Sequence, residues 1–286
     1  MILKKVAEIK DGEVLAEDIE YEGTVLISKG TILKENYIGN LIELQIELVN
    51  IEELIEDEEE KNFVSKKIYN TYYQRIRKVI EGLLITNIIE LKEMEDISNS
   101  ITEDILQYFD ENQIFKIENR KPDLYKHSMY VCVMSVCVAK WMGLSQEEIK
   151  KIALGALLHD IGYRFITIKH ENIKEEAMLA GDIFEIKKHT IYGFSIIESQ
   201  SWIDETSKQI ILSHHECIDG SGFPLKQRKI DISVQIVAVC NYLDALLCGN
   251  ACDMVSPVNA LEVLRSCSKK YDKKVINTLL EHVVEK

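Results

Sequence analysis

Five of the seven histidines and one aspartate stand in segments that are otherwise rich in apolar residues. They are His127, His159, Asp160, His189, His214 and His215. Burying so many titratable groups is costly unless they pair with one another or coordinate an ion. Imidazole and carboxylate together, with no cysteine at ligand spacing, suit Fe, Mn, Zn or similar metals rather than Mg or Ca alone. The pattern therefore predicts a metal site.

Asp160 is expected to bridge two ions, because each of its two oxygens can bind one. Two metals about 3.5–4 Å apart are a known arrangement for hydrolysing phosphate esters, since they acidify a water and neutralise phosphate charge. They would also offset the formal charge of −14, which would otherwise repel an anionic substrate. Asp123 lies four residues before His127, so we expect both side chains on one helix face, near the same cluster.

The segments around these residues carry helix signals. Pro122 suits the first turn of a helix that runs to Met142. The capping box Ser145–Glu148 opens the next helix, which ends near His159. Asp204 can cap a helix that leads to His214. The C-terminal part is therefore expected to be an all-α bundle with the histidines on its helices.

The N-terminal part has a different sequence pattern. Residues 1–52 contain short β-branched segments separated by turn signals, and 53–119 begin with an acidic run and continue with apolar residues at spacings of three and four. We expect a mainly α protein in which a small β-rich module, 1–52, and a helical linker region, 53–119, precede a helical metal-binding domain, 120–286.

Composition limits where the protein is expected to act and what it is expected to bind. No apolar run approaches the length of about eighteen residues that spans a bilayer, and the N-terminus lacks the features of a signal peptide. The seven cysteines form no CxxC pair, which fits reduced thiols. We expect a cytoplasmic protein with no membrane association. The acidic balance, without a basic cluster, argues against binding of duplex nucleic acid.

Two motifs resemble motifs of known protein families. His127 followed by His159-Asp160 is the outline of the HD-domain phosphohydrolases. More specific is the segment HHECIDGSGFP, residues 214–224, which closely resembles the HHExxDGxGYP signature of the HD-GYP family, with Phe223 in place of tyrosine. HDIG at 159–162, His189 and the helix VQIVAVCNYLDAL fall in the family's order and spacing. The resemblance covers roughly residues 120–286.

The resemblance implies a bacterial phosphodiesterase that hydrolyses cyclic di-GMP to pGpG or GMP at a centre of two or three divalent ions, iron or manganese. It implies these metal ligands: His127, His159, Asp160, His189, His214 and His215, with Asp123 at a position that supports a third ion and Asn241 at a further ligand position. It implies catalytic roles for Asp160 and Asp244. The substrate pocket would be formed by Tyr163, Asp219, Gly220, Gly222 and Phe223.

Several positions depart from the family pattern. Tyr163 replaces a lysine that resembles a phosphate contact, Asn241 replaces an aspartate ligand, and Cys217 replaces a usual arginine. The segment after Leu247 lacks a basic stretch similar to RPYR. A neutral amide binds cations more weakly than a carboxylate, and lost positive contacts weaken the hold on a dianionic ligand.

The sequence supports three hypotheses about function. The first is a cyclic di-GMP phosphodiesterase, with reduced activity. The second is a catalytically impaired signalling module of the same fold that binds metal, a nucleotide or a protein partner. The third is an HD phosphohydrolase for another nucleotide. The retained ligands favour the first interpretation. Tyr163, Asn241 and the missing basic segment favour the second. Whether the partner is a second copy of the chain or a signalling protein stays open.

Overall fold

The computed structural model describes residues 2–9, 13–21, 24–31, 33, 35–44, 46–51, 66–82, 91–107, 115–168, 178–249 and 253–285. The chain forms two compact units, Met1–Glu59 and Glu60–Lys286. The helices between residues 60 and 119 thus lie in the same unit as the later ones, whereas the three-part division stays a prediction. The acidic run falls outside the described residues.

The smaller unit is β-rich, as the sequence predicts. β1 (Ile2–Lys5) pairs antiparallel with β4 (Leu48–Ile51), and β2 (Ile19–Tyr21) pairs antiparallel with β3 (Thr24–Ile27). A 3₁₀ turn, η1 (Val6–Glu8), and the helix α1 (Glu35–Glu43) also belong to it. Its apolar core is its own, formed around buried side chains that include Leu15, Leu33 and Leu41.

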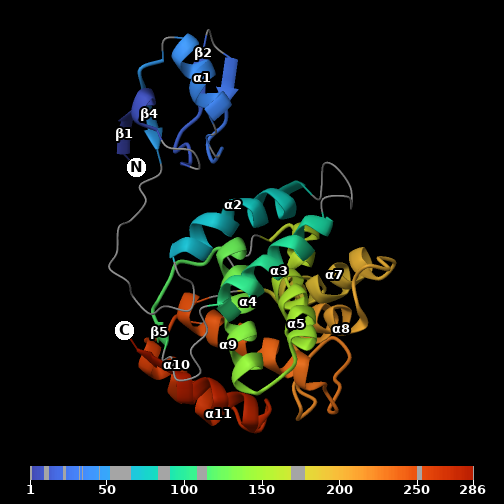
Figure 1. Ribbon diagram of the computed structural model, residues 1–286. Coiled ribbons are helices and arrows are strands. Elements are labelled where there is room, and N and C mark those ends of the chain that lie inside the picture. The colour runs from blue at the N-terminus through green and yellow to red at the C-terminus, as the bar shows by residue number, and fades with distance from the viewer. Residues whose placement is uncertain are drawn as a thin grey trace. The chain divides into compact units, whose positions relative to one another are not determined.

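The larger unit is a helical bundle, which confirms the mainly α fold (Figure 1). Its helices are α2 (Lys66–Gly82), α3 (Lys92–Gln107), α4 (Leu124–Trp141), α5 (Gln146–Leu158), α6 (Ala180–Lys187), α7 (His189–Ile197), α8 (Glu205–Ser213), α9 (Ile232–Cys248), α10 (Pro257–Ser266) and α11 (Lys273–His282), with a 3₁₀ segment, η3 (Ile161–Phe165). A short parallel pair joins β5 (Phe115–Ile117) to β6 (Val283–Glu285).

α4 and α9 form the centre of this bundle, because apolar residues cover most of their circumference and most of their side chains are buried. α4 packs against α3, α5 and α9, and α5 packs in turn on α8. On a helix that is buried on all sides, a polar side chain costs free energy unless it pairs with another group or binds a ligand. The polar residues buried on α4 and α9 are therefore candidates for function.

Helix starts follow local capping. Ser145 and Glu148 form the predicted capping box of α5, and Asp204 caps α8 by accepting from the N–H groups of Thr206 and Ser207. α4 begins two residues later than predicted. Asp123 is its N-cap and accepts from the Lys126 N–H at 2.8 Å, so Pro122 precedes the helix.

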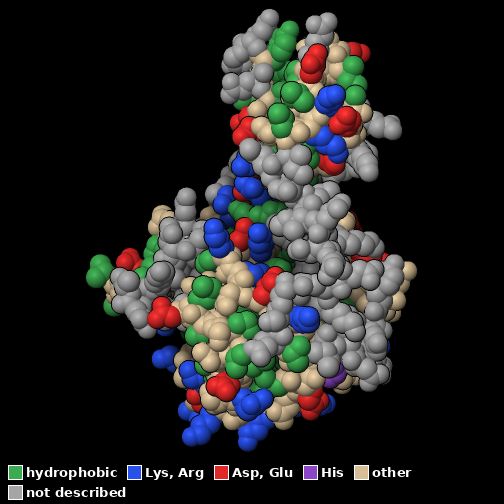
Figure 2. Space-filling view, turned by 90° about the vertical axis from the view of Figure 1, so that its left-hand side faces the viewer, with side chains coloured by type: hydrophobic (Ala, Val, Ile, Leu, Met, Phe, Trp, Pro, Cys, Tyr) green, Lys and Arg blue, Asp and Glu red, His purple; other side chains and the backbone are tan. Residues whose placement is uncertain are grey.

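Charged side chains of both signs, with apolar residues between them, occupy the face of the larger unit drawn in Figure 2. None of the helices in the described ranges combines the length and the apolar character needed to cross a bilayer.

Candidate metal centre

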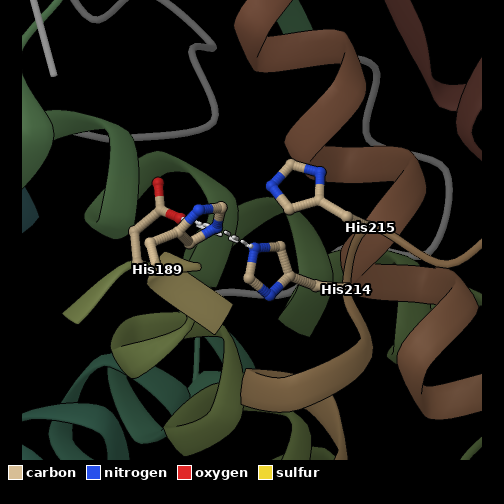
Figure 3. A group of neighbouring side chains, drawn as sticks. His189, His214 and His215 are labelled. Atoms are coloured by element: carbon tan, nitrogen blue, oxygen red, sulfur yellow. Dashed lines mark hydrogen bonds and ion pairs between the residues drawn. The ribbon is translucent and has the colours of Figure 1, made fainter. Parts of the chain in front are cut away.

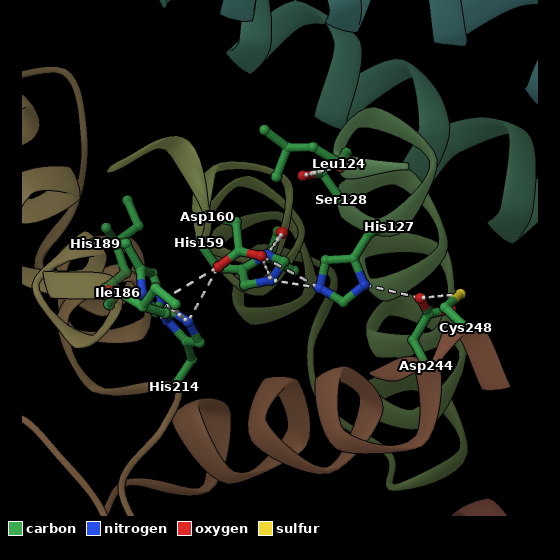
Figure 4. Close-up of polar contacts among 12 residues, drawn as sticks. Leu124, His127, Ser128, His159, Asp160, Ile186, His189, His214, Asp244 and Cys248 are labelled. Carbon is green, nitrogen blue, oxygen red and sulfur yellow. Dashed lines mark hydrogen bonds and ion pairs between the residues drawn. The ribbon is translucent and has the colours of Figure 1, made fainter. Parts of the chain in front are cut away.

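The predicted ligands come together at the ends of four helices. His127 lies on α4, His159 and Asp160 end α5, His189 begins α7, and the pair His214-His215 follows α8. Figure 4 shows Asp160 between His127 and His159 on one side and His189 and His214 on the other. Helices that are far apart in sequence thus direct their terminal polar residues to one buried point.

Asp160 is at the middle of the cluster. Its Oδ2 lies 3.4 Å from His127 Nε2 and 3.3 Å from His159 Nε2. Its Oδ1 lies 3.3 Å from His189 Nε2 and 3.5 Å from His214 Nε2. The carboxylate therefore offers one oxygen to each pair of imidazoles. Each oxygen, with the two imidazoles near it, could help to hold an ion.

Two overlapping groups of potential ligands result. One contains His127, His159 and Asp160, and the other contains Asp160, His189, His214 and His215. Within each group the ligand atoms lie within 4.8 Å of one another. The two groups share Asp160, so the geometry offers two adjacent ion positions.

Backbone carbonyls fix the tautomers of three histidines. His159 Nδ1 lies 2.7 Å from the Ala156 carbonyl oxygen, and His189 Nδ1 lies 2.7 Å from that of Ile186. His214 Nδ1 lies 3.1 Å from the Ile211 oxygen. A carbonyl oxygen can only accept, so Nδ1 must carry the hydrogen in each ring. In the neutral form, the Nε2 atoms then present bare lone pairs to Asp160 and to one another.

The pair His189 and His214 tests whether these residues fit a metal. Their Nε2 atoms are 3.2 Å apart (Figure 3). Burial lowers the pKa of His189 to about 4 and also lowers that of His214, so both rings are neutral at pH 7. Two lone pairs that face each other at this distance cannot form a hydrogen bond, and a cation ligated by both removes the conflict. The donor set fits a divalent metal of the kind bound by imidazole and carboxylate.

His127 is in a different electrostatic environment. Burial alone would lower its pKa, but Asp160 and Asp244 together raise the pKa to about 10. Its Nδ1 lies 2.8 Å from Asp244 Oδ2, and its Nε2 lies 3.1 Å from His159 Nε2. Without metal, His127 Nε2 therefore donates to His159, and a metal would have to displace this proton.

Arg120 supports His127 through Asp244, a contact that the sequence analysis missed. Its guanidinium donates to Asp244 Oδ1 and lies 3.7 Å over the ring of Tyr130. Burial would raise the pKa of Asp244, but the charge of Arg120 and the bond to His127 lower it. Asp244 therefore lies behind His127 as an anion rather than among the Nε2 atoms. No spacing rule connects Arg120 to a residue so distant in sequence.

Two predicted ligand positions lie outside both groups. Asp123 caps α4 and also accepts from the Tyr73 hydroxyl at 2.9 Å, so its carboxylate is used by the helix start. Asn241 is buried on α9, one turn before Asp244. Its side chain forms no hydrogen bond with any residue in the described ranges.

Tyr163 and Phe223 border the cluster with flat rings. Tyr163, on η3, stacks on His189 with ring centroids 4.4 Å apart and an interplanar angle of 13°. Phe223 stacks on His215 at 4.5 Å and 19°. Gly222 allows this, because a Cβ there would come within 2.4 Å of the Cys217 nitrogen.

The remaining predicted loop residues shape the loop itself. Asp219 accepts from both the backbone N–H and the hydroxyl of Ser221, at 2.9 and 2.6 Å. Gly220 has a φ of 80°, in the left-handed region that favours glycine. Asp219 is thus engaged within its own turn, and these two residues place the loop beside the cluster.

Glu216 anchors this loop from within, a role that the sequence analysis did not assign. Its fully buried carboxylate accepts from the backbone N–H groups of Leu225, Lys226 and Gln227 at 2.5, 2.9 and 2.9 Å. One buried carboxylate thus holds three successive backbone N–H groups of the loop. The position of Glu216 directly after the double histidine is the signal that could have indicated it.

The fold and the donor set together define a class: a helical bundle that gathers histidines and a His-Asp dyad in one buried cluster that could hold divalent metal. The model of the family described as HD domain matches residues 113–275, more than half of the chain. The chain belongs to the HD domain family.

Three proteins illustrate the similarity. Over 170 residues, 57% of this chain, it is 36% identical to a cyclic di-GMP phosphodiesterase of Thermotoga maritima. Over 234 residues, 79% of this chain, it is 26% identical to 3'3'-cGAMP-specific phosphodiesterase 2 of Vibrio cholerae. The chain spans only 46% and 41% of the length of these relatives. The solved structure of Bd1817, an HDG"Y"P protein of Bdellovibrio bacteriovorus, shares the fold, with a TM-score of 0.65, 19% identity and 98% coverage of both chains.

Proposed function

We propose that this protein is a metal-dependent phosphodiesterase that hydrolyses a cyclic dinucleotide. The observation that carries the proposal is the pair of neutral imidazoles, His189 and His214, whose lone pairs face each other beside Asp160. The relatives named as cyclic di-GMP and 3'3'-cGAMP phosphodiesterases support the substrate class. Cyclic di-GMP is the first substrate to test, and 3'3'-cGAMP is the second.

We propose that two divalent ions, iron or manganese, are held by the two ligand groups that share Asp160. Asp123 and Asn241 belong to neither ligand group. To bind a third ion, the Asp123 carboxylate would have to release the N-terminus of α4 that it caps. When bound, such ions acidify a water and neutralise the charge of a phosphate. Partners beyond the substrate, whether a second copy of the chain or a signalling protein, stay predictions.

The chain's own residues orient this chemistry. The Arg120–Asp244 pair fixes His127. The carbonyls of Ala156, Ile186 and Ile211 fix the rings of His159, His189 and His214. The rings of Tyr163 and Phe223 are proposed to contact the nucleobases, because flat apolar surfaces stack on bases and exclude water from the site. Neither side chain supplies a charge to the phosphate.

The test combines metal analysis with turnover. Protein purified anaerobically should contain about two transition-metal ions per chain and should convert cyclic di-GMP to pGpG or GMP, followed by chromatography. Fewer than one ion per chain, with no uptake of added Fe²⁺ or Mn²⁺, would contradict the metal centre. Fully loaded protein that converts no cyclic dinucleotide would contradict the enzyme.

Tyr163 specifically favours a second candidate, a signalling module that binds without hydrolysis. Its ring lies flat on His189. A tyrosine carries no ammonium group, so it cannot replace the family's lysine, which resembles a phosphate contact. Binding of both metal and cyclic di-GMP without product would support this candidate. Hydrolysis of a different nucleotide would instead support a general HD phosphohydrolase.

A further inference from the structure

A half-buried lysine lies at the edge of the cluster, on the last residue of α6. The ammonium of Lys187 lies 5.3 Å from the centroid of the Phe223 ring, and that ring stacks on His215. Lys187 is also two residues before His189. It therefore brings a positive charge to the side of the centre where α7 and the 214–224 loop meet.

Among the residues that the structure describes, Lys187 differs from other cations near the cluster in having no carboxylate partner. Arg120 is paired with Asp244, and Lys188 is paired with Glu185 at 2.7 Å while lying over Phe184. Across the described ranges, Lys187 forms no ion pair. In a chain with 48 acidic and 34 basic residues, a half-buried lysine without an anionic partner is available for an anion from outside.

Given the proposed function, on which this inference rests, we propose that Lys187 binds a phosphate of the cyclic dinucleotide. Neither aromatic wall of the site carries a charge, since Tyr163 and Phe223 present rings. A lysine ammonium is a compact charge with three donors on a flexible stem, so it can move from an aromatic face to a phosphate oxygen. Lys187 thereby supplies the cation that Tyr163 does not.

The experiment compares two adjacent lysines in the metal-loaded protein of 286 residues. Lys187→Met removes the charge and keeps the apolar stem, and Lys188→Met is the matched control. The readouts are KM and kcat for cyclic di-GMP, or the Kd measured by calorimetry if the wild type binds without turnover. Metal content and the thermal midpoint are measured for every variant.

Lys187→Met should raise KM or Kd about tenfold or more, the effect of losing one charge-assisted hydrogen bond, with metal content unchanged. Lys188→Met should stay within about twofold of the wild type, since its ammonium is already paired with Glu185. Lys187→Arg should restore most of the affinity, because the charge returns. A purely structural role for Lys187 would instead change the thermal midpoint or metal content.

The outcomes separate this inference from the proposed function. If the wild type binds or hydrolyses cyclic di-GMP and Lys187→Met matches Lys188→Met, the role of Lys187 is overturned and the function stands. If Lys187→Met loses metal or stability and Lys187→Arg does not recover binding, the lysine is structural and the inference fails. A loaded wild-type protein that neither binds nor hydrolyses a cyclic dinucleotide overturns both.

Discussion

Asn241 and Asp244 occupy successive turns of α9, and both side chains are buried, yet only Asp244 has a charged partner. At the scale of single residues, the metal centre therefore depends on which side chains of this helix carry charge. Asp244 acts through His127, and its own charge is balanced by Arg120. Asn241 is neutral at a position where the family has an aspartate.

Asn241→Asp is predicted to raise metal affinity. A carboxylate presents a charged oxygen where the amide presents a neutral one, and cations prefer the former. Titration of metal-free protein with Mn²⁺ should give a lower Kd, and turnover should rise if the wild type has any. Asn259→Asp adds the same charge on the exposed start of α10 and should leave the Kd unchanged. Equal or weaker binding by a folded Asn241→Asp protein would show that this side chain does not face the metals.

Arg120→Met is predicted to destabilise the protein by about 3 kcal/mol, because the buried Asp244 charge keeps His127 but loses its guanidinium partner. Urea denaturation measures the effect, with the exposed Arg265→Met as the control. Adding Asp244→Asn to Arg120→Met should recover part of the loss, since the buried charge that lost its guanidinium partner is then removed. Losses that simply add would contradict a direct interaction.

At the scale of elements, the site depends on how closely η3 approaches α7. Gly162, in η3, is the residue at this contact. A Cβ added there would lie 1.9 Å from the His189 carbonyl oxygen and 2.7 Å from the Gly193 nitrogen. Backbone atoms cannot yield as a flexible side chain can, so the two elements would have to separate. This separation would move His189 away from Asp160 and from the stacked Tyr163.

Gly162→Ala should therefore lower both stability and metal content. We expect a loss of about 2 kcal/mol or more in the free energy of unfolding, as for overpacking in a core. Gly181→Ala on α6 is the control, because a Cβ there meets no atom within 4 Å. Chemical denaturation and elemental analysis of both variants provide the test. A Gly162→Ala protein with wild-type metal content would contradict the proposed dependence.

Sequence reasoning predicted the parts of this site that depend on local pattern. The capping box at Ser145 and the N-cap at Asp204 are visible within a few residues, and the structure confirms both. The motif resemblance brought together ligands that the folded chain does place around Asp160. Their role as metal ligands stays a prediction.

What sequence reasoning missed depends on pairing between distant segments. Arg120 and Asp244 meet across 124 residues of chain, and no local signal links them. Asp123 was expected to face the cluster because it lies four residues before His127. Its carboxylate instead caps α4, since an N-cap residue lies outside the regular helix and its side chain turns back to the first turn.

At the scale of the whole molecule, the two units have separate apolar cores. The core of the smaller unit extends over buried residues between Val6 and Ile51, and that of the larger unit begins at Tyr72. Every described residue of the metal cluster belongs to the larger unit. Independent cores are typical of parts that fold separately.

Deletion of residues 1–59 should leave the metal content per chain unchanged. The shortened protein should keep its helical circular dichroism and its thermal midpoint, because no residue of the larger core is removed. Elemental analysis and thermal melting are the measurements. A folded but metal-free product would show that the smaller unit contributes to the centre.

Metal removal is predicted to destabilise the intact protein. A ligand that binds only the native state adds about 4 kcal/mol when it is present at a thousand times its Kd. Without metal, the neutral lone pairs of His189 and His214 also face each other. Treatment with a chelator should lower the thermal midpoint, and Mn²⁺ should restore it. An unchanged midpoint would contradict a native metal site.

The carbonyl partners of the histidines have a consequence for how such a site can be inherited. His159, His189 and His214 each use an oxygen three residues earlier in the same segment, at Ala156, Ile186 and Ile211. Each four-residue segment thus fixes the tautomer of its own ligand, whatever connects it to the next segment. Insertions or deletions in the connections can accumulate without changing which nitrogen faces the metal. The connecting segments can therefore diverge over evolutionary time while each ligand keeps its chemistry.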